Sequence, residues 1–200
     1  MSNQKEIRSL EEVRTSEETD MVVSGYALKW DTWSEDLGGF TETIDKEALK
    51  DTDLSDVRCY FNHDSSMVLG RTSSGTLELE LDDTGLYFRC QLPDTSYGRD
   101  LFQSIKRSDI NQCSFGFIID EDGDDFNKRD DGMYERIIRK IKSLWEISIV
   151  SMPAYSDTSV AVAQRSIEKL EQEELDKVKE AEQREIELLK LKLELRKLKK

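Results

Sequence analysis

Three residues that could together hydrolyse an amide bond lie in or at the end of three separate predicted strands: His63, Ser114 and Glu146. A serine hydroxyl becomes nucleophilic when a base takes its proton, and the base works better when a third group orients and charges its imidazole. His63 is the only histidine in the chain, so that third group is a carboxylate, a hydroxyl or absent. The ordinary alternatives stay open: a tolerated strand serine, a partly buried strand-end histidine and a surface acid.

Ser114 belongs to residues 112–119, which alternate as a strand does. The odd-numbered residues from Cys113 to Ile119 make an apolar face, and Ser114 shares the opposite face with Gly116. Because glycine has no side chain, we expect room beside the hydroxyl for a substrate backbone. We also expect the hydroxyl to face an open surface groove, where an extended peptide can pair along the strand.

His63 and Glu146 have similar places in two other strands. His63 follows a strand predicted over residues 57–62 and has the parity of the core-facing residues Cys59 and Phe61. Glu146 lies in a strand predicted over residues 144–152, where it shares one face with Ser148.

The remaining pattern predicts the mainly β, α+β class. Strands are predicted over residues 21–28, 40–44 and 133–141, and a hairpin over residues 77–81 and 86–92. A helix is predicted to about Arg107 with Thr95 or Ser96 as its N-cap, residues 120–131 read as a polar loop, and residues 156–163 as a short final strand. Such short strands favour an antiparallel barrel or sandwich decorated by helices over residues 21–163.

Composition excludes several functions. The net charge of -14 argues against nucleic-acid binding, and no apolar run is long enough for a membrane span. The three cysteines form no CxxC pair, so neither disulfides nor a zinc site are expected, and no cofactor motif is present. Residues 1–20 are polar, without the apolar region of a signal peptide, and are predicted to be a flexible arm. A reducing cytoplasm is the expected compartment.

Residues 164–200 form a distinct tail. They lack proline and glycine and are rich in strong helix formers. Leu188, Leu191, Leu195 and Leu198 step by three and four residues, as in a coiled-coil seam, so the helix should seek a partner or self-associate. The alternative is a solvated helix with no defined partner.

Several short motifs, taken in order, resemble the prohead (capsid maturation) proteases of tailed phages, the HK97 type. They cover residues 25–27, 40–44, 59–64, 69–71, 113–117 and 144–154. The resemblance implies a serine endopeptidase related in fold to the herpesvirus assemblins, a small antiparallel barrel surrounded by helices. It implies action inside the assembling procapsid in the bacterial host cytoplasm, on the scaffold segment of the major capsid protein and on the protease itself.

The resemblance also implies roles for individual residues. Ser114 is the nucleophile and His63 the general base, as the matching motifs have it. The assemblins use a second histidine as third member, which this chain lacks, so Glu146 is the candidate and Asp64 the alternative. Arg71 is a candidate for binding the oxyanion or the substrate.

Two other functions compete with this one. The same body and tail could serve as a catalytically inactive assembly scaffold or adaptor, with Ser114 and His63 merely structural. An esterase is disfavoured because Ser114 lies in a strand without a G-x-S-x-G motif, and a metalloenzyme because there is a single histidine.

Overall fold

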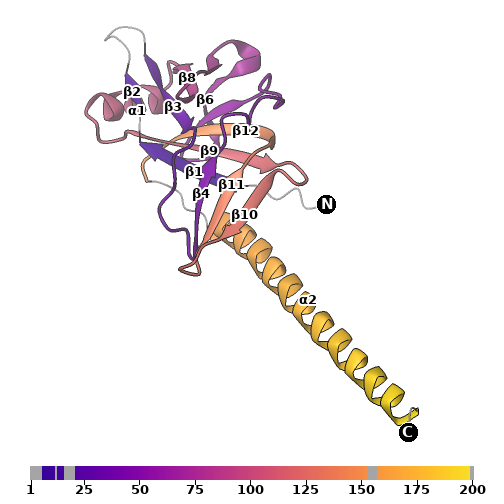
Figure 1. Cartoon of the computed structure of the whole chain (residues 1–200). Coiled ribbons are helices and arrows are strands. Elements are labelled where there is room, and N and C mark those ends of the chain that lie inside the picture. Colours follow the sequence, from indigo (N-terminus) through magenta and orange to yellow (C-terminus); the bar gives the residue numbers. More distant parts are fainter. Residues whose placement is uncertain (1–5, 12, 16–20, 153–156, 199–200) are drawn as a thin grey trace. The chain divides into compact units, whose positions relative to one another are not determined.

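The computed structural model describes residues 6–11, 13–15, 21–152 and 157–198. The chain divides into two compact units, Met1–Val160 and Ala161–Lys200. The first holds the strands and one helix, and the second holds most of a long helix (Figure 1). The α+β class with a long C-terminal helix is therefore confirmed.

The strands of the first unit form three sheets. The five-stranded sheet has the order β1 (Glu6–Glu11), β9 (Gln112–Ile119), β12 (Ile141–Val150), β5 (Arg58–Phe61) and β6 (Asp64–Arg71). The three-stranded sheet has the order β10 (Asp124–Lys128), β11 (Tyr134–Ile138) and β4 (Phe40–Ile44). The four-stranded sheet has the order β2 (Arg14–Thr15), β3 (Val22–Lys29), β8 (Gly85–Gln91) and β7 (Leu77–Leu81). Closure into one barrel is not found among the described strands, so the predicted barrel is not confirmed.

The apolar faces predicted from alternation build one core. Cys113, Phe115 and Phe117 of β9 are buried, and so are Ile147 and Ile149 of β12. The predicted hairpin is present as the antiparallel pair β7–β8. Helix α1 (Ser96–Lys106) starts as predicted, with the Thr95 hydroxyl accepting a hydrogen bond from the Gly98 N–H at 3.2 Å.

Three segments depart from the predictions. The flexible arm expected over residues 1–20 is wrong for Glu6–Glu11, which form β1 at the edge of the large sheet, and for Arg14–Thr15, which form β2. The loop expected over residues 120–131 contains strand β10, and the final strand expected over residues 156–163 is wrong because α2 (Asp157–Leu198) begins there. A short η1 helix (Thr72–Ser74) completes the elements.

The order of the large sheet brings the predicted site strands together. Strand β12 lies between β9, to which it is antiparallel, and β5, to which it is parallel. Ser148 of β12 therefore lies opposite Ser114 on one side and Tyr60 on the other. No described helix is long and apolar enough to span a membrane.

Candidate active site

His63 is carried by a two-residue turn between β5 and β6. Phe61 pairs with Asp64, and the two residues between them, Asn62 and His63, have φ angles of 51° and 60°. A hairpin turn of this length favours positive φ at both central residues, and asparagine and histidine accept it more readily than most residues. The Asn62 Oδ1 atom accepts a hydrogen bond from the Ser151 N–H at 2.9 Å, which ties the turn to the end of β12.

The imidazole of His63 meets the carboxylate of Glu146. The Nδ1 atom lies 3.1 Å from Oε1, and the side chains are 20% and 7% exposed. The other ring nitrogen, Nε2, is buried and has no hydrogen-bond partner among the described residues. An imidazole held on one side by a carboxylate and unengaged on the other has the arrangement of a general base.

Glu146 is positioned by a β-bulge and by a neighbouring hydroxyl. The register of β12 against β9 shifts between Leu144 and Glu146, and such bulges re-aim side chains. The Ser148 hydroxyl donates to the other carboxylate oxygen, Oε2, at 3.0 Å. Ser148 was not among the predicted site residues, although its place beside Glu146 on one strand face was visible in the sequence.

Gly116 makes room for this carboxylate. A Cβ atom at Gly116 would lie 2.5 Å from the Trp145 ring and 3.0 Å from Cγ of Glu146. The space beside Ser114 that we expected for a substrate backbone is therefore filled by residues of β12. The glycine serves the close packing of β9 on β12.

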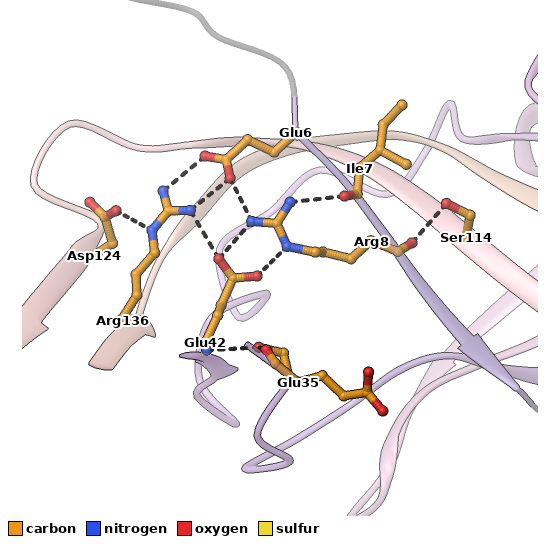
Figure 2. A network of polar contacts seen from close by, with 9 residues as sticks. Glu6, Ile7, Arg8, Glu35, Glu42, Ser114, Asp124 and Arg136 are labelled. Atoms are coloured by element: carbon orange, nitrogen blue, oxygen red, sulfur yellow. Dashed lines mark hydrogen bonds and ion pairs between the residues drawn. The ribbon is translucent and has the colours of Figure 1, made fainter. Parts of the chain in front are cut away.

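Ser114 is fully buried, so the expectation of an open surface groove is wrong. Strand β1 lies along β9 with Ser9 opposite Ser114, and the Ser114 hydroxyl donates to the main-chain oxygen of Arg8 at 2.7 Å (Figure 2). Within the described chain, the hydroxyl makes no hydrogen bond to His63. The structure thus joins His63 to Glu146, and sets Ser114 on the adjacent strand with its hydroxyl turned to β1.

The other two predicted site residues have local partners. The Asp64 carboxylate is exposed and accepts hydrogen bonds from the Ser66 N–H at 2.8 Å and the Ser66 hydroxyl at 2.6 Å. The Arg71 guanidinium binds both carboxylate oxygens of Asp56, with Nη2 at 2.8 Å from Oδ2. This contact lowers the pKa of Asp56 to about 2.

A cluster of charges, buried except for the partly exposed Asp124, anchors β1 next to this site (Figure 2). Its members are Glu6 and Arg8 of β1, Glu42 of β4, Arg136 of β11 and Asp124 of β10. Burial alone would raise the pKa of Glu42, but its ion pairs and hydrogen bonds with Arg8 and Arg136 outweigh burial and hold that pKa below its ordinary value. Charged residues near the N-terminus read as solvated in the sequence, so this cluster was missed.

The described residues contain no group of His, Cys, Asp and Glu able to hold a metal ion. Glu146 lies on β12, next to the strand that carries the buried Ser114, and its imidazole partner His63 lies in the turn after β5, on the other side of β12. An imidazole–carboxylate pair near a buried serine has the components of a serine hydrolase site. Residues 8–173 match the sequence model of the caudovirus prohead serine proteases, and the chain belongs to that family. A solved structure, the bacteriophage T4 capsid assembly protease gp21, is similar at a TM-score of 0.45 and 12% identity, covering 74% of this chain and 99% of that one. No curated protein matches the chain.

Proposed function

We propose that the protein is a serine endopeptidase that cleaves the scaffold segment of the capsid protein, and itself, during maturation of a phage procapsid. Membership of the prohead serine protease family supports a capsid maturation protease. The observation that carries the proposal is the 3.1 Å contact between His63 Nδ1 and Glu146 Oε1, which leaves Nε2 to accept a proton.

In the proposed reaction, the Ser114 Oγ adds to the carbonyl carbon of the scissile bond while its proton passes to His63 Nε2. Glu146 holds the imidazole through Nδ1 and stabilises the positive charge that forms on the ring. The imidazolium then gives the proton to the departing amine as the C–N bond breaks. Water, activated by the same imidazole, hydrolyses the resulting ester and returns the proton to Oγ.

The position of Ser114 supports its role in part. It lies directly across from Ser148, whose hydroxyl is bonded to the carboxylate that meets His63. The Ser114 hydroxyl has to leave the Arg8 oxygen and turn toward Nε2 before it can attack. Catalysis on this site therefore requires a change at the contact between β1 and β9.

That same contact favours a second candidate function. A serine that is fully buried and bonded to a neighbouring strand is also what a purely structural serine looks like. On this alternative, the chain is a catalytically inactive scaffold or adaptor for capsid assembly on the family fold.

Coexpression with the capsid protein distinguishes the two. We expect the wild type to give a shortened capsid protein, Ser114→Ala to give none, and Ser104→Ala, which removes a helix hydroxyl bonded to the Asp100 oxygen, to match the wild type. A shortened product that persists with Ser114→Ala, or is absent with the wild type, would contradict the peptidase. Intact mass of the purified chain, wild type against Ser114→Ala, tests self-cleavage.

The proposed partners are the major capsid protein and its scaffold segment, met inside the assembling procapsid in the host cytoplasm. Helix α2 exposes Leu175, Val178, Ile186, Leu188 and Leu189. These side chains support a role for the tail in binding scaffold helices or in self-association through a coiled coil.

A further inference from the structure

Strand β1 has the place of a bound peptide. It is the edge strand of the large sheet and runs antiparallel to β9, with Ser9 opposite Ser114. Extended peptides bind proteins by adding a strand to such an edge. With β1 seated there, Ser114 has no exposed surface, and its hydroxyl is bonded to a main-chain oxygen, that of Arg8.

The side chains of β1 are bound as pairs of opposite charge. Glu6 holds Arg136 through two hydrogen bonds of 2.7 and 2.8 Å. Arg8 holds Glu42 through two of its nitrogens, Nη2 lying 2.7 Å from Oε2. Glu6 and Arg8 are two residues apart in a strand, so both project from the same face, as Figure 2 shows.

Glu42 and Arg136 would be poorly accommodated without β1. Both are at most 3% exposed, and a buried charge that loses its partner is strongly destabilising. Without β1, Arg136 would keep its hydrogen bonds from Nη1 to Glu42 Oε2 at 2.9 Å and from Nε to Asp124 Oδ2 at 2.7 Å. Glu42 would lose its ion pair with Arg8. A peptide can therefore replace β1 at low cost only if it brings an acid for Arg136 and a base for Glu42.

We propose that the edge of β9 covered by β1 is the peptide-binding site and that β1 occupies this site as an internal competitor. The site selects extended peptides of the pattern acid–x–base. This inference rests on the proposed function and names its substrate class. The carbonyl of the basic residue lies against Ser114, so cleavage follows that residue. When β1 is bound, the Ser114 hydroxyl donates its hydrogen bond to the Arg8 carbonyl oxygen and not to His63 Nε2. Because the serine is then not activated by the histidine, the peptide bond after Arg8 is held in an unreactive arrangement.

An internal competitor makes the enzyme weak toward dilute peptides. A tethered segment has an effective concentration in the millimolar range, so a free peptide must reach similar concentrations to exchange with it. A closed shell packed with scaffold segments supplies such concentrations.

A reversible lock on β1 tests whether it must leave. Glu11 and Gln112 are register partners at the end of β1, and cross-strand partners are close enough for a disulfide. We expect the oxidised double variant Glu11→Cys/Gln112→Cys to lose cleavage of the capsid protein and dithiothreitol to restore it. The control Glu11→Ser/Gln112→Ser should cleave equally under both conditions. Equal cleavage by the locked and reduced protein overturns the inference while leaving the peptidase intact.

Binding without catalysis tests the charge pattern independently of activity. The probe is a fluorescein-labelled peptide with the sequence of residues 3–12, titrated into full-length Ser114→Ala and followed by anisotropy. Exchanging the acid and base of the peptide should weaken binding about tenfold or more, because like charges then meet in the buried site. The disulfide lock should abolish binding of both peptides. Equal binding of the two peptides, or binding that survives the lock, overturns the inference, whereas lock-sensitive and charge-selective binding without any cleavage overturns only the peptidase.

Discussion

The Nδ1 atom of His63 lies 3.1 Å from the Oε1 atom of Glu146, a carboxylate 83 residues further along the chain. A two-residue turn carries the imidazole, and a bulged strand carries the carboxylate. The pair is thus fixed from both sides before any substrate arrives.

If this pair works as proposed, Glu146→Gln should lower kcat on a cleavable capsid fragment by about 10²- to 10⁴-fold, because an amide cannot stabilise the imidazolium. The fold should be retained, since the amide still offers an oxygen to Ser148. Steady-state kinetics and circular dichroism give the two readouts. Asp64→Asn is the matched control, because the exposed Asp64 carboxylate is hydrogen-bonded to Ser66 two residues further along β6, and it should leave kcat unchanged. A reversed ranking of the two variants would make Asp64 the third member.

Gly116→Ala should destabilise the fold by about 1–3 kcal/mol through overpacking against Trp145 and Glu146. Urea unfolding of the wild type and variant measures the difference. In a Trp145→Phe background the smaller ring leaves more space, so the same substitution should cost less. Equal costs in the two backgrounds would mean that the indole is not what excludes a side chain at Gly116.

Lowering the pH should weaken the ion pair between Glu42 and Arg8 that anchors β1. The folded pKa of Glu42 lies below its ordinary value of 4.5, so its contribution to stability is complete above that value and is lost as the pH falls through the folded pKa. Glu42→Gln should therefore cost about 3–5 kcal/mol at pH 7 and flatten the dependence of stability on pH below 5. Urea unfolding from pH 7 down to pH 3 measures both effects.

The control for that series is Glu78→Gln, which removes an exposed pair with Arg89 at 3.6 Å. Its cost should stay below about 1 kcal/mol and its pH curve should parallel the wild type. Parallel curves for Glu42→Gln as well would show that Glu42 titrates alike in the folded and unfolded chain.

Deleting residues 166–200 should leave peptide cleavage intact and reduce copackaging of the enzyme with the capsid protein. The tail and the body fall largely into separate compact units, which is why the two effects should separate. Kinetics on a peptide and gel analysis of purified procapsids measure them. Unchanged incorporation of the shortened enzyme would rule out the tail as the packaging element.

The site strands could largely be predicted because apolar and polar or small residues alternate along residues 113–117 of β9 and along residues 145–149 of β12. Alternation put Glu146 and Ser148 on one face, and their hydrogen bond requires that placement. The same logic failed at His63, since two residues with positive φ break the alternation that a straight strand would continue. It also failed to reveal that Trp145 and Glu146 fill the space above Gly116, because that contact depends on a bulge.

The strand at Glu6–Glu11 could not be predicted from the sequence for a different reason. Six residues with Glu6, Arg8 and Glu11 read as solvated, because charged side chains are rarely buried without partners. The partners, Glu42 and Arg136, lie in strands of another sheet, and nothing local in the sequence connects them. The sequence of strand β10, with Asp124 and Asp125, predicts a loop for the same reason.

The large sequence separation between Glu6 and Arg136 affects the order in which the parts of the chain fold. These residues are 130 positions apart, and Arg8 is 106 positions before Ser114. On the ribosome, β1 emerges well before β11 and must wait for it before the Glu6–Arg136 pair can form, and such distant contacts form slowly. A nascent chain therefore passes through an interval in which β1 does not yet cover the edge of β9 beside Ser114.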